Sequence, residues 1–235
     1  MRAARAAGFD WRAAIDAFAA DIPAQDAPAR RLFAALVADV EAFPAANAYH
    51  NRLHTLDTMW AMKLLCATAV RNGIALPLPP HLLILVMLGH DLRHPGGTGG
   101  AQGDLERLSA DVVAAFARAS GLPDALTAKI VDLILATRVR VQLGARAAGA
   151  IELSPGLVGE ADVLASLLPD IGRDLAACLT LEMAAAGEPV AAPFESPPVR
   201  LAFLRGYVRG LSAPALALGL DRVIDDQIAG LSSDG

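Results

Sequence analysis

The sequence predicts an all-α fold, a bundle of helices that forms a single compact domain. Hydrophobic residues make up 54% of the chain but aromatic residues only 5%, and the alanine-rich excess favours helices over strands. Apolar residues recur every three or four positions along most of the sequence, which is the spacing of one helix face. At 235 residues the chain suits one domain, 1–235.

The apolar spacing and the turn residues divide this domain into helices. Pro44, the pair Asn72-Gly73 and Pro169 stand at expected helix ends, as proline and glycine do in many proteins. The stretch 141–158 is rich in glycine and contains Pro155, so we expect it to be irregular. The expected helices are 10–20, 28–43, about 47–73, 81–91, 104–116, 124–139, 159–168, 170–186, 199–211 and 214–230.

The most apolar segment, residues 82–88, carries seven consecutive large apolar side chains. Such a run predicts a helix that is buried on all sides and too short to span a membrane. His90, Asp91 and His94 follow directly, and the glycine-rich stretch 96–100 then opens a loop. Because isolated polar groups are costly at the edge of a core, His90 and Asp91 need partners, and a metal ion is one.

Charge and cysteine content exclude several classes of function. The net charge of −5, without a block of lysine or arginine, gives no support for binding a nucleic-acid duplex. Cys66 and Cys178 form no paired motif, which fits a reducing compartment and argues against disulfides or a thiolate zinc site. Residues 1–7 lack the apolar core of a targeting signal. We therefore expect a soluble cytoplasmic protein without a membrane partner, and the composition hints at a bacterial origin.

Four of the five histidines fall in two short segments, His50 with His54 and His90 with His94. A pair four residues apart lies on one face of a helix, which suits metal ligands but also occurs in ordinary packed surfaces. His81 has no such neighbour, and we expect it to be a structural residue. The two segments together favour a metal site over chance.

These segments match known signatures. Tyr49-His50-Asn51-x-x-His54-x-x-Asp57, followed by His90-Asp91-x-x-His94-Pro95-Gly96, resembles the two motifs of class I cyclic nucleotide phosphodiesterase catalytic domains. The order His54, His90-Asp91 and a distant Asp is similar to that of ligands in the HD-domain metal-dependent phosphohydrolases. The resemblance covers roughly residues 45–140. It implies an HD-domain helical bundle with a metal-site core at about 45–186, on which the helices of 10–43 and 199–230 pack.

The resemblance implies His54, His90 and Asp91 as metal ligands, together with a later aspartate. Asp162 is the best candidate, with Asp170 and Asp174 as weaker rivals; alternatively, Asp162 is a carboxylate that a helix N-terminus favours. Two imidazoles and two carboxylates suit Zn, Mn, Fe or Co.

In the family the aspartate at the place of Asp91 also bridges to a second ion, often Mg or Mn, that is otherwise held by water. His94, Glu106 and Thr137 occupy places that fit this water shell. No histidine follows His94, so the resemblance disfavours an HD-type di-iron oxygenase, whose second metal has its own histidine ligands.

The resemblance further implies a hydrolase that acts on a phosphate ester of a small, nucleotide-like molecule through metal-activated water. His50 would be the general acid, a task its usual pKa range suits, and Asp91 would hold the activating metal. Asn51 and Arg93 are candidates for holding the phosphate or orienting the acid. The expected partner is a small anionic phosphoester, and the apolar C-terminal helices leave a homodimer open.

Some family positions differ. Gly99 replaces an asparagine, Arg138 follows Ala-Thr where an aspartate is expected, and the purine-reading glutamine has no clear counterpart. Gln227 is the only late glutamine, and Phe203 and Tyr207 are the nearest late aromatic residues. These departures motivate an alternative, a non-catalytic HD module that binds a nucleotide or a protein partner.

Overall fold

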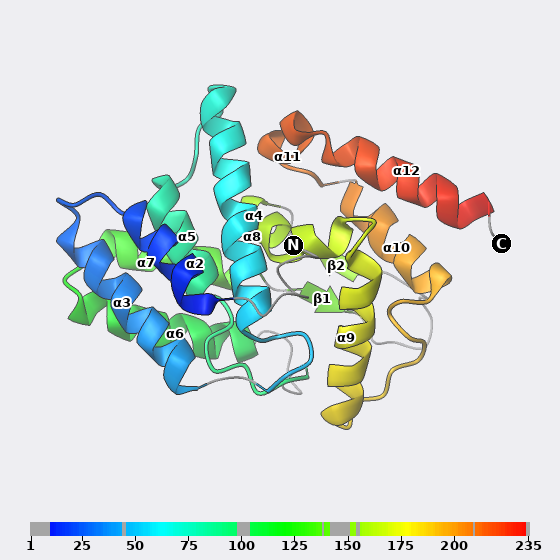
Figure 1. The fold of residues 1–235 in the computed structure, drawn as a ribbon, viewed down its shortest axis with the longest axis horizontal. Coiled ribbons are helices and arrows are strands. Elements are labelled where there is room, and N and C mark those ends of the chain that lie inside the picture. Colours follow the sequence, from blue (N-terminus) through cyan, green and yellow to red (C-terminus); the bar gives the residue numbers. More distant parts are fainter. Residues whose placement is uncertain are drawn as a thin grey trace.

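The computed structural model describes residues 10–43, 46–97, 104–137, 139–141, 151–153, 156–208 and 210–233. These parts of the chain form eleven helices and one two-stranded sheet, so the expectation of an all-α fold is confirmed (Figure 1). Within them, no helix combines the length and apolarity that crossing a membrane requires. The elements are α2 Trp11–Ala20, α3 Ala27–Ala42, α4 Arg52–Arg71, α5 Pro80–Gly89, α6 Asp104–Ala119, α7 Asp124–Leu135, β1 Val139–Val141, β2 Ile151–Leu153, α8 Leu157–Leu167, α9 Gly172–Ala185, α10 Pro197–Val208, α11 Ala213–Leu218 and α12 Leu220–Ser233.

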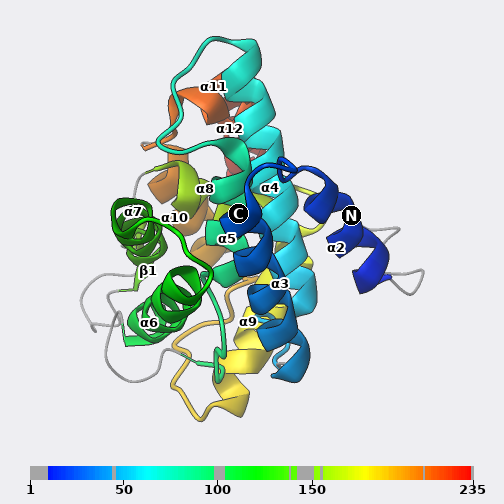
Figure 2. The same cartoon turned by 90° about the vertical axis from the view of Figure 1, so that its left-hand side faces the viewer.

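Helix α5 is the centre of the core. Every residue from Leu82 to Gly89 is buried, as the apolar run predicts, because α3, α4, α6, α7 and α8 all pack against this helix. The long helix α4 crosses the middle of the molecule, with α2, α3 and α5–α7 on one side and α8–α12 on the other (Figure 1). Figure 2, turned by 90°, shows α6 and α7 side by side, in agreement with their close packing. The start of α4 and the end of α5 are therefore held rigidly.

The helix α4 begins later than the sequence suggests. Its expected start near residues 47–49 is wrong, because Asn51 caps the helix by accepting hydrogen bonds from the backbone N–H groups of Leu53 and His54. His50 therefore precedes the helix and lies in a bend. His50 thus lies outside the helix and His54 inside it, although the centres of their rings lie only 5.4 Å apart.

Two short strands, β1 and β2, lie where the sequence predicts the end of a helix and an irregular segment. The expected helix 124–139 ends at Leu135, and residues 139–141 pair antiparallel with residues 151–153, in the register Val139 to Leu153 and Val141 to Ile151. The β-branched residues at alternate positions favour strands, but the alternation is too short to stand out in the sequence. The intervening residues 142–150 lie outside the described part of the chain.

The expected helix 214–230 is two helices. Gly219 adopts a left-handed conformation with φ of 82° and ends α11, and α12 then starts at Leu220. Glycine is the residue that takes this conformation most easily. Behind this corner, α10 and α12 pack together and form a small second cluster of buried apolar side chains with α8.

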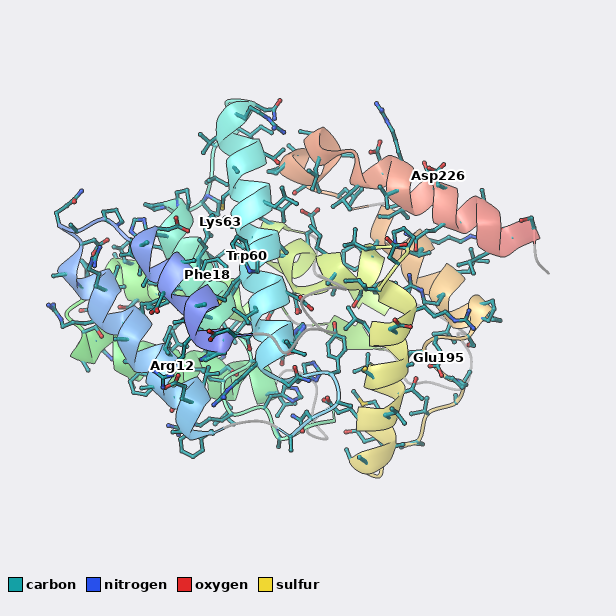
Figure 3. All side chains as sticks on the ribbon, in the orientation of Figure 1. Arg12, Phe18, Trp60, Lys63, Glu195 and Asp226 are labelled. Atoms are coloured by element: carbon teal, nitrogen blue, oxygen red, sulfur yellow. The ribbon has the colours of Figure 1, made fainter. Side chains whose placement is uncertain are left out.

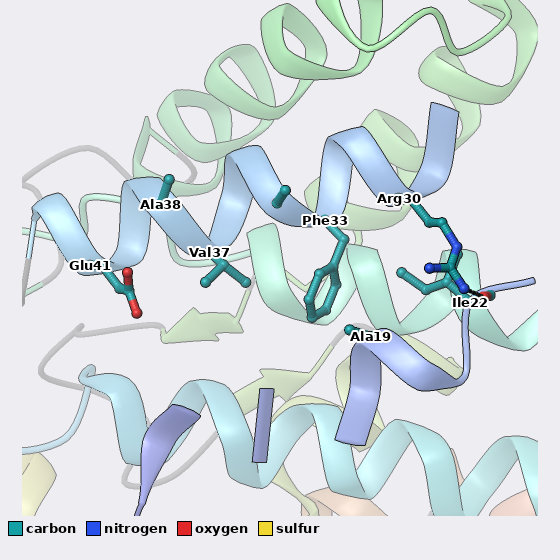
Figure 4. Close-up of a pocket in the computed structure, with 8 residues that line it drawn as sticks. Ala19, Ile22, Arg30, Phe33, Val37, Ala38 and Glu41 are labelled. Carbon is teal, nitrogen blue, oxygen red and sulfur yellow. Dashed lines mark hydrogen bonds between the residues drawn. The ribbon is translucent and has the colours of Figure 1, made fainter. Parts of the chain in front are cut away.

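Helix α2 covers the outside of α3 and α4. Lys63 of α4 places its ammonium group 5.2 Å from the centre of the Trp60 ring and 5.7 Å from that of Phe18. These three side chains are labelled in Figure 3. Between α2 and α3 runs an open groove of about 350 Å³, where Arg30 donates a hydrogen bond of 2.7 Å to the carbonyl of Ile22 (Figure 4). None of the candidate site residues lines this groove.

We expect Gly172→Ala to destabilise the protein by about 1–3 kcal/mol, the usual cost of overpacking a core. A β-carbon at position 172 would lie 2.2 Å from the backbone oxygen of Ser166, which a side-chain rotation cannot relieve. Gly230→Ala in α12 is the matched control, because a β-carbon there meets no atom within 4 Å. The control should leave stability unchanged or raise it by up to about 1 kcal/mol. Urea denaturation of both variants measures the difference, and equal stability would contradict the packing.

Candidate metal centre

Side-chain atoms of four residues, which come from α4, from the end of α5 and from α8, converge near the start of α4. His54 Nε2 lies 3.3 Å from Asp91 Oδ2 and 3.1 Å from Asp162 Oδ1, and His90 Nε2 lies 3.1 and 3.3 Å from the same two oxygens. We call His54, His90, Asp91 and Asp162 the four-residue cluster. Such separations suit donor atoms that share one ion at about 2.0–2.2 Å. The structure thus brings together the four ligands that the sequence resemblance implies.

The histidines of this cluster are buried and oriented. Their side chains are 4% and 1% exposed, and within the described part of the chain neither Nε2 atom has a hydrogen-bond partner. His90 is the C-cap of α5, and its Nδ1 lies 2.7 Å from the carbonyl oxygen of Met87. Because a carbonyl only accepts, Nδ1 carries the hydrogen and the lone pair of Nε2 points into the cluster. This is the usual arrangement of a metal-binding histidine.

Helix α8 delivers the second carboxylate. Asp162 lies in its second turn, next to the buried Ala161, and α8 packs against both α4 and α5. The rival candidates Asp170 and Asp174 are exposed and belong to no such cluster in the described residues. The geometry therefore favours Asp162.

The field within the cluster favours positive charge. Burial lowers the pKa of His54, but the carboxylates of Asp162 and Asp91 outweigh it and raise that pKa to about 9. Conversely, burial raises the pKa of Asp162, and the two imidazoles lower it to about 2. A divalent cation satisfies both the carboxylates and the two imidazole lone pairs, so the residues present fit a metal ion.

A second pair of ionisable groups adjoins the cluster. His50 Nδ1 lies 2.5 Å from Glu182 Oε1, while Glu182 Oε2 accepts hydrogen bonds from the backbone N–H groups of Tyr49 and His50. Glu182 belongs to α9 and its side chain is 3% exposed. Burial raises its pKa, but the bond to His50, the His50 charge and the two backbone donors lower it to about 2. Glu182 is thus a carboxylate that holds the His50 ring at Nδ1.

His94 and Tyr49 border this pair. The His94 ring stacks on that of His50 with centroids 3.9 Å apart and planes 18° from parallel. Burial and the His50 charge lower the pKa of His94 to about 4, and its Nδ1 accepts a hydrogen bond from the backbone of Gly96. With this lowered pKa, His94 is a neutral imidazole at neutral pH. Tyr49 packs its ring 4.7 Å from that of His54, and its hydroxyl group forms a hydrogen bond with Ser166 Oγ.

His50, His94 and Glu182 also lie close enough together to be considered a metal site. Their hydrogen bonds argue against it, because His50 Nδ1 and Glu182 face one another and the lone pair of His94 Nδ1 is occupied by Gly96. His50 and Glu182 form a hydrogen-bonded pair instead, and the His94 ring stacks on His50.

The remaining candidates, Asn51, Arg93, Glu106 and Thr137, are not part of the four-residue cluster. Asn51 caps α4, and Arg93 forms an ion pair with Asp39 of α3. Glu106 is half-buried on the first turn of α6, and Thr137 is buried and donates its hydroxyl hydrogen to the carbonyl of Ile134. Their contacts do not place Asn51 or Arg93 against the cluster, and the part of Glu106 and Thr137 in a water shell stays a prediction.

The departures from the family pattern are partly visible. Gly99 and Arg138 lie outside the described residues. Gln227 donates a hydrogen bond of 2.6 Å to the carbonyl of Leu167 and accepts one from Arg200, so it ties α12 to α8 and α10. Tyr207 donates to the carbonyl of Gly159. These contacts give Gln227 and Tyr207 structural roles.

Glu182 is the functional residue that sequence reasoning missed. It lies 132 residues after His50, near the C-terminal end of α9, and no spacing rule links the two. One signal was present: Glu182 is an acidic residue between Leu181 and Met183 in an otherwise apolar stretch.

No protein-family model matches the sequence, and no curated protein matches it either. The fold is similar to the crystal structure of the phosphodiesterase domain of the RhoPDE fusion protein from the choanoflagellate Salpingoeca rosetta. The two chains superpose with a TM-score of 0.52 and 16% sequence identity, covering 94% of this chain and 86% of that chain. At this identity the similarity concerns the fold.

Proposed function

We propose that the protein is a metal-dependent phosphohydrolase of the HD-domain type, acting on a phosphate ester of a small, nucleotide-like molecule. The observation that carries the proposal is the convergence of two buried imidazole lone pairs on two carboxylates, directly beside a histidine that a buried glutamate orients. The similarity in fold to a phosphodiesterase domain supports the same reaction class.

The four-residue cluster would hold a divalent cation, for which Zn, Mn, Fe and Co all suit the donor set. When bound, such an ion supplies a Lewis acid and lowers the pKa of water toward neutrality. Asp91 is 18% exposed, so one side of its carboxylate is accessible to a second ion such as Mg or Mn. His94, Glu106 and Thr137 are our candidates for the water shell of that second ion.

His50 is the proposed general acid. Glu182 accepts the hydrogen of Nδ1, which fixes the orientation of the ring, and Nε2 is then the atom that would donate a proton to the leaving alkoxide. Protonation of the leaving group is the step that water performs poorly at neutral pH. The half-buried position of His50, 17% exposed, allows a substrate to reach the ring.

The substrate class follows from the chemistry. A centre of divalent cations attracts an anionic phosphoryl group, whereas the net charge of −5 disfavours long polyanions such as duplex nucleic acid. A cytoplasmic location and a bacterial origin are proposed from composition and cysteine content alone.

A His50→Gln variant should lose about 10²–10⁴-fold in turnover while it keeps its bound metal, because His50 is not in the four-residue cluster. The assay is release of phosphate or alcohol from a panel of phosphomonoesters, phosphodiesters and cyclic nucleotides, with added Mn or Mg. His81→Gln is the matched control, since His81 also pairs with a carboxylate, Asp26 at 2.9 Å, and belongs to neither group described above. A metal-loaded wild type that hydrolyses nothing on this panel would favour the non-catalytic binding module.

A further inference from the structure

The turn that follows α5 carries Asp91 and His94, and it contains one unusual backbone conformation. Among the residues that the structure describes, Arg93 is the one non-glycine residue with a positive φ, 59°. The left-handed conformation is unfavourable for a residue with a β-carbon, and such outliers persist only where surrounding contacts enforce them. Arg93 lies two residues after the proposed metal ligand Asp91, so contacts that enforce its conformation also bear on the position of that ligand.

The enforcing contact comes from α3. The Arg93 guanidinium donates hydrogen bonds to both carboxylate oxygens of Asp39, from Nε at 3.1 and 3.2 Å and from Nη2 at 2.6 Å. The Asp39 side chain is 3% exposed, and the Arg93 guanidinium also lies 4.5 Å from the centre of the Phe43 ring. A planar guanidinium that donates from two nitrogens to one carboxylate fixes the orientation of the arginine side chain as well as its distance from the aspartate.

Two further bonds hold the same turn from other elements. Asn47, between α3 and α4, donates to the carbonyl of His94 at 3.0 Å, and Ser109 of α6 donates to the carbonyl of Leu92 at 3.2 Å. These two bonds fix the flanking residues, whereas the ion pair fixes the residue that reverses the chain between Asp91 and His94. The ion pair is the one contact of the three that involves two charges.

We propose that the Asp39–Arg93 ion pair is a positioning latch that holds Arg93 in its left-handed conformation and thereby sets Asp91 and His94 relative to His54 and Asp162. Arg93 is then a positioning residue whose guanidinium is engaged by Asp39, in place of the phosphate-holding role expected from the sequence. The effect on metal affinity rests on the proposed function, whereas the effect on the turn does not.

Backbone hydrogen exchange tests the latch without any metal. Asp39→Asn should accelerate exchange of the Leu92, His94 and Gly96 amides, which are hydrogen-bonded within the turn, by about tenfold relative to wild type. Glu41→Gln is the matched control, because Glu41 lies on the same helix and pairs with Arg12 on its other face. Unchanged exchange in Asp39→Asn would overturn the latch.

Metal affinity tests the consequence. Titration of metal-free protein with Mn or Zn against a competing chelator should show binding about tenfold weaker in Asp39→Asn, the usual scale for groups that orient ligands, and unchanged in Glu41→Gln. A loosened turn with wild-type affinity would overturn the positioning role. If wild-type protein binds neither ion, the proposed metal centre is wrong, and the exchange experiment alone still decides whether the latch exists.

Two substitutions of Arg93 separate the strain from the latch. Arg93→Ala and Arg93→Gly both remove the ion pair, but glycine adopts a φ of 59° without strain. We therefore expect Arg93→Gly to unfold at a temperature equal to or above that of Arg93→Ala, while both bind metal more weakly than wild type. Wild-type affinity in Arg93→Gly would mean that the turn needs no latch, which overturns the proposal.

Discussion

Purified Asp91→Ala protein is expected to contain no bound divalent metal and to show no metal-dependent phosphoester hydrolysis. Asp91 Oδ2 faces both histidine Nε2 atoms, so its removal eliminates one of four ligands and half of the negative charge at the centre. Elemental analysis of wild type and variant side by side gives the metal content directly.

Stability provides a second readout for the same substitution. A ligand that binds only the folded protein stabilises it by about 2.7 kcal/mol at a hundredfold excess over its dissociation constant. Addition of a chelator should therefore lower the unfolding temperature of wild type and leave that of Asp91→Ala unchanged. Asp170→Ala is the control, because Asp170 was a rival ligand in the sequence and is exposed in the structure. Full metal content in Asp91→Ala would rule out the proposed centre.

The fold and the four-residue cluster were accessible from the sequence because their signals are local. The apolar run 82–88 marks a buried helix by itself, and His90 and Asp91 are neighbours at its end. His54 and Asp162 are distant, but each sits in a short segment with a recognisable pattern. Burial also indicates that His90 and Asp91 have partners, because polar groups at the end of a core helix persist only where they are paired or bound.

The parts that the sequence did not reveal depend on contacts across the fold. Glu182 meets His50 only because α9 packs beside the start of α4, and Asp39 meets Arg93 only because α3 lies against the end of α5. Both acids occupy ordinary positions on helices. The start of α4 was also misplaced, because the capping role of Asn51 competes with an equally good helical continuation toward residue 47.

The Glu182→Gln variant should combine a large loss of turnover with a loss of stability that depends on pH. The amide oxygen can still accept from the backbone N–H groups of Tyr49 and His50, which leaves the amide NH₂ facing His50 Nδ1. A donor at that place cannot accept the Nδ1 hydrogen, so the ring loses the contact that orients it as the general acid. We expect kcat to fall about 100-fold or more, with metal content unchanged because Glu182 is not in the four-residue cluster.

The pH dependence of stability tests the same contact independently of activity. The pKa of Glu182 is lowered from 4.5 to about 2 in the folded protein, so its ionised form stabilises the fold. That stabilisation is fully present above pH 4.5, on the order of 3 kcal/mol, and disappears as the pH falls through 2. Urea denaturation should therefore show the largest gap between wild type and Glu182→Gln near neutral pH, with the gap closing below pH 4.5. Asp226→Asn, at an exposed residue of α12, is the control and should leave stability nearly unchanged at every pH, as surface substitutions usually do. A gap that is constant with pH would mean that Glu182 stabilises the fold by packing alone, and the oriented general acid would lose its structural support.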